Sequence, residues 1–599
     1  MKLGNCNMKL KGILFVLLLG SFVVAATATP GVASEVTELK IGDGSKWHCY
    51  NKTKQWIFKG DIGGKWQEGP MKIPDDYPEY IKIFLKESKA GVTQPPVDRN
   101  LHSRAFYTAE EFTDFTAEFE FHTSYRDTGT GAAGLIIRGK DANHFYAVYF
   151  PWCGQQLRAD CFWTYVLKAE GDGYLRSIKE EWVPGVPIET ERWYKVRVEV
   201  KGSTIDVWVD GRRAISVETD GQYKSGAVGL LGYGMYFFRD IKITGKKTPL
   251  KNWAPDQKIP LHNMEVGVDS RSTPSALVAP NGDILLAAGK LMVRSKDKGR
   301  TWGEPEKLPE KFGTLIDHDA MFCTSDGRMI VHIWRSRKVT KKPYPEILIS
   351  ESTDNGYTWS DPVQTQVEKT GWPEHVPQLV NYGGITETAD GTLLCFLYHR
   401  VVEEGRKITD KRTWSAAHFK AFATRSTDGG KSWSGPIELD QPTWWDRNEP
   451  TGQIPRGKIP GSVDFTEPSG VAIGNTVTVL IRPIYSATMW QCWSYDAGAT
   501  WDAASRTTFP GYAQSMLRLK SGPILCAHRF PQHTVNISYD DGLNWDEGTI
   551  IDYPAWANGC MVEVEPGVVL CATQNFQPPW PLLVHLFRVT PEGIQPISR

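Results

Sequence analysis

Two carboxylates in the C-terminal half of this 599-residue chain have the residue type and spacing for acid–base chemistry. Asp319 and Glu467 each lie about eight residues before a glycine turn between two apolar segments. Glycoside hydrolysis uses two such groups, one as the acid and one as the base or nucleophile. The alternative for Asp319 is that it neutralises Arg335 or caps a turn, and the sequence leaves both interpretations open.

Basic residues recur at the matching position after the same turns. The residues about eight positions after each turn glycine are Lys290, Arg335, His399 with Arg400, Arg482, Arg529 and Gln574. A single basic residue at a strand end is usually solvated surface. Here a basic residue occurs at the same distance after the turn, which we call the blade phase, in five of six segments. This recurrence predicts positive charges that converge in a closed ring. Asp319 and Glu467 offset part of this charge, and an anionic ligand is expected to offset the rest.

A tyrosine is the third group that this chemistry can use. Tyr382, Tyr512 and Tyr553 open or precede predicted inner strands. A phenol has a pKa of about 10 and needs a partner to act as a nucleophile. We assign Tyr553 to the site with Glu467 and Asp319, while packing remains the alternative for each of the three phenols.

An internal repeat indicates how these residues are positioned. The pattern S-x-D-x-G-x-[TSN]-W occurs five times, beginning at Ser295, Ser352, Ser426, Ser494 and Ser538. Asp caps backbone N–H groups and Gly adopts a positive φ, so each copy predicts a tight turn covered by its Trp. Five copies and six strand–turn–strand starts predict a six-bladed β-propeller over residues 262–599, each blade a four-stranded meander. The first strands start, and the second strands end, around one funnel mouth.

The preceding region also reads as β-structure. Residues 115–121 alternate apolar and polar side chains, as a half-buried strand does, and similar segments continue to residue 243. These segments predict a two-sheet β-sandwich over residues 35–245, and residues 246–261 read as a linker. Lys2, Lys9 and Lys11 precede an apolar run that is too short for a membrane span, so residues 1–34 are expected to be a signal peptide.

Composition narrows the function classes. The formal net charge of -1 gives no global field for nucleic acid or membrane. No cofactor and no transmembrane segment are expected, and no Cys/His spacing resembles a zinc site. The protein is expected to be secreted or periplasmic. Its oligomeric state is left open by the sequence.

Several pieces carry a family resemblance. Residues 262–599 resemble the sialidase (neuraminidase) superfamily, in which the repeat is called the Asp-box or BNR repeat. Arg271-Ser272-Thr273-Pro274 is similar to the family's first arginine motif, and Glu467-Pro468-Ser469-Gly470 with Arg482 matches its middle-blade pair. Residues 105–245, with the pieces GLIIRGKDANHFYAVYF and GAVGLLGYG, resemble concanavalin-like (laminin-G-like) jelly-roll sandwiches. The expected fold is therefore all-β, a jelly-roll sandwich followed by a six-bladed propeller.

The resemblance implies a site. The family's three arginines clamp the substrate carboxylate, and Arg271, Arg482 and Arg529 are the matching residues here; Arg335 and Arg400 are added from blade phase. The family's nucleophilic Tyr is not matched in phase, because the aligned position is Asn558, and no Asp occupies the connection of the first blade. We expect an exo-acting hydrolase on an acidic glycan. The alternatives are a non-catalytic glycan-binding propeller, or another exo-glycosidase or a lyase acting on uronic or sulfated polysaccharide.

Overall fold

The computed structural model describes most of the chain beyond residue 35. The described residues are 36–39, 46–50, 57–58, 92–93, 103–123, 130–153, 162–183, 185–189, 192–233, 236–255, 257–270, 272–312, 320–335, 342, 344–372, 379–402, 417–440, 463–484, 486–552, 559–574 and 580–597. The predicted signal peptide, residues 1–34, lies outside them. No helix in this part of the chain has the length and apolar character that crossing a membrane requires.

The N-terminal region consists of antiparallel strands. They are β1 (Val36–Glu38), β2 (Trp47–Tyr50), β3 (Ile57–Phe58), β4 (Val92–Thr93), β5 (Ser103–Thr123), β6 (Thr130–Gly139), β7 (His144–Cys153), β8 (Trp163–Glu170), β9 (Leu175–Trp182), β10 (Arg192–Lys201), β11 (Thr204–Val209), β12 (Arg212–Glu218), β13 (Gly226–Tyr233) and β14 (Tyr236–Pro249). The predicted alternation in β5 is confirmed, because Phe115, Ala117, Phe119 and Phe121 are buried in one core.

The expected division of this region into two sheets is not confirmed. The hydrogen-bonded order runs without a break through β1–β14, and it continues into four strands of the C-terminal region to make one 18-stranded sheet. The sandwich therefore stays a prediction.

Five separate sheets form the propeller arrangement of the C-terminal region. In order they are β16 (Ser275–Val278), β17 (Ile284–Ala288), β18 (Leu291–Ser295) and β19 (Glu306–Lys307); β20 (Met321–Cys323), β21 (Met329–Arg335), β22 (Glu346–Ser352) and β23 (Val363–Gln364); β25 (Leu379–Glu387), β26 (Leu393–Val402), β27 (Ala417–Ser426) and β29 (Ile437–Glu438); β30 (Phe465–Ile473), β31 (Thr476–Pro483), β32 (Trp490–Ser494) and β33 (Ser505–Arg506); and β38 (Cys560–Glu565), β39 (Val568–Gln574), β40 (Pro581–Thr590), β15 (Asn263–Asp269) and β41 (Gly593–Pro596). A short 3-10 helix spans Glu310–Phe312, and β24 (Gln366–Val367) pairs with β28 (Ser432–Trp433).

The expectation of six separate blades is thus wrong: five separate sheets are present. A further meander, β34 (Ser515–Arg518), β35 (Ile524–His528), β36 (His533–Ser538) and β37 (Thr549–Asp552), is joined to the N-terminal region by pairing of β37 with β9. This meander is not a separate sheet because β37 pairs with β36 on one side and with β9 on the other. β9 thereby covers the outer edge of the meander, which would otherwise be an open sheet edge. Sequence periodicity does not reveal which edge is shared.

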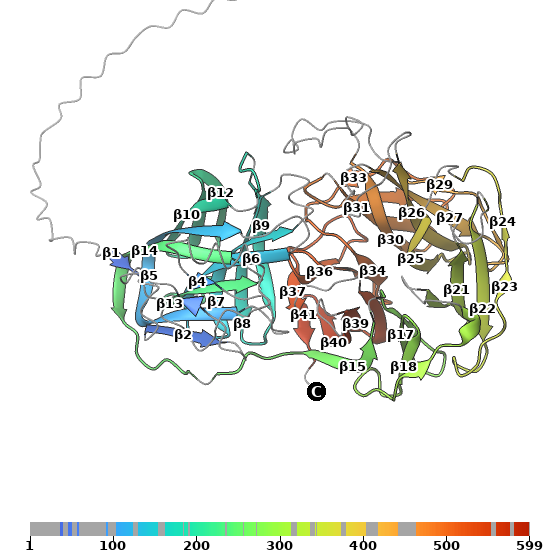
Figure 1. Ribbon diagram of the computed structural model, residues 1–599, viewed down its shortest axis with the longest axis horizontal. Coiled ribbons are helices and arrows are strands. Elements are labelled where there is room, and N and C mark those ends of the chain that lie inside the picture. Colours follow the sequence, from blue (N-terminus) through green and yellow to red (C-terminus); the bar gives the residue numbers. More distant parts are fainter. Residues whose placement is uncertain are drawn as a thin grey trace, which may run out of the picture.

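The inner strands close into a ring. β16 adjoins β20, β20 adjoins β25, and β25 adjoins β30; β30 then adjoins β34, β34 adjoins β38, and β38 adjoins β16. β15, from the start of the region, pairs with β40 near its end. The two ends of the C-terminal region are thereby held in one sheet, so the ring cannot open without breaking strand pairing (Figure 1).

The five repeats share one hydrogen-bond pattern. In the fourth copy, Ser494 Oγ donates to Asp496 and accepts from Gly498 N at 2.8 Å, while Asp496 Oδ1 accepts from Thr500 N at 2.8 Å. The other four copies repeat these contacts. The predicted covering by Trp is complete only at Trp359 and Trp433; the other three are half-buried.

The glycine of each repeat also packs against the neighbouring sheet. An added Cβ on Gly498 would lie 2.3 Å from Leu394 Cδ2 on β26, and one on Gly356 would lie 2.7 Å from Leu285 Cδ2 on β17. Gly299, Gly430 and Gly542 make the same kind of approach. The repeat therefore uses glycine for two reasons, a positive φ and close contact between sheets.

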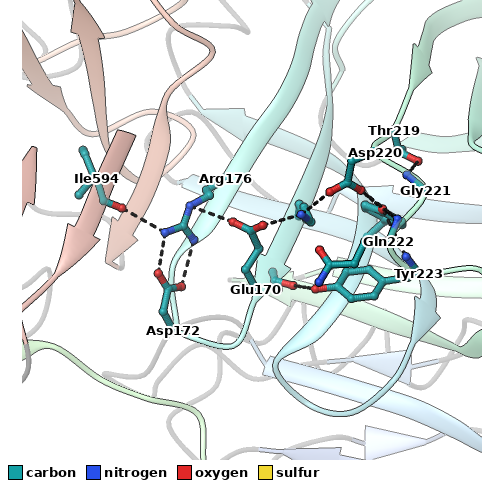
Figure 2. Close-up of polar contacts among 12 residues, drawn as sticks. Glu170, Asp172, Arg176, Thr219, Asp220, Gly221, Gln222, Tyr223 and Ile594 are labelled. Carbon is teal, nitrogen blue, oxygen red and sulfur yellow. Dashed lines mark hydrogen bonds and ion pairs between the residues drawn. The ribbon is translucent and has the colours of Figure 1, made fainter. Parts of the chain in front are cut away.

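Polar contacts reinforce the junction of the two regions. Arg176 on β9 donates to both oxygens of Asp172, at 3.0 and 2.6 Å, and to the carbonyl of Ile594 on β41 at 3.0 Å (Figure 2). Glu170 and Asp220 extend this network across the N-terminal region through Lys168. The N-terminal region is therefore fixed to the propeller by side chains as well as by strand pairing.

Candidate functional site

Glu467 lies in an irregular stretch of β30. The pairing of β30 with β31 shifts register between Thr466 and Ser469, so the bulge holds Glu467 and Pro468. Pro468 has no N–H group to pair, which makes a bulge a suitable place for it. Glu467 has a φ of +52°, a left-handed conformation that is unfavourable for any residue other than glycine. Such strain is concentrated at functional sites, where surrounding structure maintains it.

Arg482, near the end of β31, pairs with this carboxylate. Its Nη1 lies 2.6 Å from Glu467 Oε1, and the two side chains are 6 % and 8 % exposed. The backbone N–H of Ala513 donates to Glu467 Oε2 at 3.1 Å, so both carboxylate oxygens accept a hydrogen bond. Gln514 Nε2 donates to the Glu467 and Leu480 carbonyls. Blade phase places both residues at the expected funnel mouth, but in the structure the Glu467 and Arg482 side chains are buried.

Tyr512 joins the second arginine to this pair. The Cζ atoms of Arg482 and Arg529 lie 4.9 and 4.7 Å from the centroid of the Tyr512 ring. Arg529 N also donates to the Tyr512 carbonyl at 3.2 Å. A cation near an aromatic face is attracted by the ring quadrupole. We call Glu467, Arg482, Tyr512 and Arg529 the carboxylate–arginine cluster.

Among the remaining predicted site residues, Arg335 alone has a described side chain, and it is not part of this cluster. Arg335 is exposed at the end of β21, and among the described residues no contact joins it to Glu467. Arg400 is on β26, where it pairs with Phe419, and its side chain lies outside the described part. Arg271, Asp319 and Tyr553 lie outside the described residues, so their roles stay predictions.

His399, one of the residues expected in the ring of basic charge, carries no charge at neutral pH. This side chain is buried against Phe422, with 5.1 Å between ring centroids. Burial lowers the pKa of His399 to about 4, with the charge of Lys420 adding to the shift, so the imidazole is neutral at neutral pH. Lys290 is exposed. The positive charge that the described residues bring together is thus that of Arg482 and Arg529.

The sequence offers Tyr512 as one of three candidate phenols and does not single out Gln514 as a bonding group. Tyr512 precedes by two residues the position that matches Glu467 in blade phase, which is Gln514. That proximity was the signal available in the sequence. The position of Gln514 in its blade cannot show that its side chain donates a hydrogen bond to the Glu467 carbonyl in the bulge of β30, because this contact joins two sheets.

Two family comparisons match parts of the chain. Residues 46–244 match the 3-keto-alpha-glucoside-1,2-lyase-like domain, and residues 334–555 match the BNR repeat-like domain. The predicted resemblance to BNR-repeat propellers is confirmed by the second match. No curated protein matches the chain.

Solved structures resemble the chain at low identity. A Hadza microbial sialidase is 11% identical, with 84% of this chain and 96% of that chain covered and a TM-score of 0.40. A leech intramolecular trans-sialidase is 11% identical, with 81% and 94% covered and a TM-score of 0.35. A protein of unknown function from Dyadobacter fermentans is 16% identical, with 55% and 98% covered and a TM-score of 0.39. Likeness at this level assigns no function.

Proposed function

We propose that this protein is an exported, exo-acting glycoside hydrolase that removes a carboxylated sugar from the end of a glycan. The carboxylate–arginine cluster is the observation that carries the proposal. It combines a hydrogen-bonded carboxylate, a phenol and two guanidinium groups, held by a strained bulge. Guanidinium groups bind carboxylates through charge-assisted hydrogen bonds, which favours an acidic substrate over a neutral one.

The proposed chemistry uses a phenol as nucleophile. Glu467 takes the phenolic proton of Tyr512 as the oxygen attacks the anomeric carbon and the glycosidic bond breaks, and positive charge from Arg482 and Arg529 stabilises the developing phenolate. Water then attacks the anomeric carbon of the glycosyl–tyrosine intermediate, which releases the sugar, and Glu467 returns the proton to the phenol. The leaving oxygen takes its proton from a carboxylic acid, for which Asp319 is the prediction. Tyr553 is the alternative phenol. Arg529 binds the carboxylate of the sugar, and Arg271, Arg335 and Arg400 are predicted to add to that binding from other blades.

The test is a screen of the purified full-length protein on fluorogenic aryl glycosides of sialic acid, glucuronic acid and neutral sugars. We expect turnover of a carboxylated glycoside, and loss of it by roughly 100-fold or more in Glu467→Gln, because a proton acceptor is removed from the reacting group. Glu387→Gln is the matched control. Glu387 is the last residue of the inner strand β25, whereas Glu467 lies near the start of the inner strand β30. Tyr512→Phe and Tyr553→Phe identify the phenol. Absence of turnover on every carboxylated glycoside overturns the proposal.

A second candidate is a non-catalytic glycan-binding propeller. The buried ion pair of Glu467 and Arg482 favours this function. In this role the Glu467 carboxylate holds the Arg482 guanidinium in place and does not act as a base. Calorimetric binding of an acidic oligosaccharide without any release of product would select this function. Cleavage that leaves an unsaturated sugar would instead select a lyase.

A further inference from the structure

One face of the N-terminal region packs against the propeller next to the carboxylate–arginine cluster. Along β7 the side chains alternate: Tyr146, Val148 and Phe150 face the region's own core, and Phe145, Ala147 and Tyr149 face the other way. From β8, Trp163, Tyr165 and Leu167 share this second face. The core they form includes Ala487, Tyr512, Ala513, Phe530 and Ile550 of the propeller. β7 and β8 are therefore buried on both faces.

Two tyrosines of this face contact a single short segment of the propeller. Gln532 Nε2 donates to Tyr149 Oη at 2.5 Å, and the Tyr165 ring lies edge-on to Phe530 with 6.4 Å between centroids. Phe530 and Gln532 belong to the connection between β35 and β36, which begins with Arg529. The N-terminal region thus holds the segment that carries one arginine of the cluster.

The same segment leads directly into the cluster. Phe530 packs on Tyr512, with 6.1 Å between ring centroids, and the backbone of Arg529 donates to the Tyr512 carbonyl at 3.2 Å. Ala513, the next residue, donates its N–H to Glu467 at 3.1 Å. One uninterrupted series of contacts therefore runs from Tyr149 and Tyr165 to Arg529, Tyr512 and Glu467.

We propose that Tyr149 and Tyr165 of the N-terminal region are positioning residues for the carboxylate–arginine cluster of the propeller. They fix the 529–532 segment, which in turn sets the place of Arg529 and of Tyr512. The N-terminal region is then part of the functional unit and not a spacer or a separate binding module. The catalytic consequence rests on the proposed function, whereas the positioning itself does not.

The test is hydrogen–deuterium exchange of the full-length protein, which needs no substrate. In Tyr149→Phe the Gln532 hydrogen bond is lost while the ring volume is kept. We expect amides in peptides covering residues 510–533 to exchange about 10-fold faster, with unchanged exchange in the separate β16–β19 sheet. Tyr165→Leu removes the ring contact and should have the same local effect. Tyr165→Phe keeps the ring and should restore slow exchange.

Tyr194→Phe is the matched control. Tyr194 is a buried tyrosine of the same region whose hydroxyl donates to the Pro187 carbonyl at 3.1 Å, away from the propeller. Unchanged exchange at 510–533 in Tyr149→Phe overturns the proposal, as does equal acceleration in Tyr194→Phe. If a carboxylated substrate is found, Tyr149→Phe should raise its KM several-fold with a smaller change in kcat. Failure of the glycoside screen alone would overturn the proposed function and leave the exchange result standing.

Discussion

Arg482 Nη1 lies 2.6 Å from Glu467 Oε1, and this ion pair is buried where a bulged strand meets the end of its neighbour. The relationship changes how each residue can be tested. A buried carboxylate without its partner is costly, so deleting Arg482 affects folding as well as binding. Arg529, which is only half-buried, is the better probe of ligand recognition.

Arg482→Ala is predicted to destabilise the protein by about 3–5 kcal/mol, because it leaves Glu467 buried and uncompensated. Urea unfolding at neutral pH measures the change. Arg300→Ala, at an exposed arginine that pairs with Glu565 at 3.5 Å, should change stability by less than about 0.5 kcal/mol. Equal stability of Arg482→Ala and the parent would show that the pair is not a structural element.

Arg529→Ala is predicted to raise KM for a carboxylated glycoside by roughly 10–100-fold, since a charge-assisted hydrogen bond contributes about 1.5–3 kcal/mol. A neutral glycoside, if it is turned over, should show little change. Steady-state kinetics on both substrates give the comparison. A similar rise for both substrates would mean that Arg529 supports the site and does not bind the carboxylate.

Gly498→Ala is predicted to cost more stability than Gly474→Ala, although both glycines have positive φ, +80° and +65°. An added Cβ at Gly474 meets nothing within 4 Å, so only the left-handed backbone penalty of about 1–2 kcal/mol applies. At Gly498 the Cβ would lie 2.3 Å from Leu394 Cδ2, which adds about 1–3 kcal/mol of overpacking. Thermal or urea unfolding of the two variants tests whether the repeat glycine packs between sheets.

Asp546→Asn is predicted to remove one source of the pH dependence of the free energy of unfolding. Burial raises the pKa of Asp546 to about 6, and the charge of Glu547 adds to the rise. Between about pH 4 and 6 the folded state therefore holds a proton that the unfolded state releases, so stability from this group falls as pH rises through that window. Asparagine can still accept through Oδ1 from Ile537 N and Gly548 N. The stability of the variant relative to the parent should increase between pH 4 and 6, measured by urea unfolding.

Three buried histidines are predicted to affect stability in the opposite direction to Asp546, by lowering it as pH falls. Burial lowers the pKa of His399 and His528 to about 4 and that of His533 to about 3. Below pH 6.5 the unfolded chain protonates these side chains while the folded protein keeps them neutral, so stability falls as pH drops toward 4. Each histidine contributes at most about 1.4 kcal/mol per pH unit. His399→Phe should make the slope of unfolding free energy against pH shallower, and an unchanged slope would exclude His399 as a source.

Local regularities could be predicted from sequence because they depend on neighbours along the chain. The alternation of Phe115 to Phe121 specifies one buried face of β5, and each S-x-D-x-G copy contains every group of its own turn. Blade phase placed Glu467 and Arg482 at the start and the end of adjacent strands of one hairpin, whereas their ion pair is seen only in the structure.

Contacts between sheets could not be predicted in this way. Blade phase placed Arg335 and His399 with Arg482, yet the first is exposed and the second is buried and neutral, because burial depends on what packs over a strand end. The sequence by itself determined the β-class and the repeats. Only the tertiary structure decided that Tyr512 lies with both arginines, because that packing joins separate strands and connections. It also decided that β9 adds to β37, since edge pairing there joins residues more than 300 positions apart, such as Arg176 and Thr549.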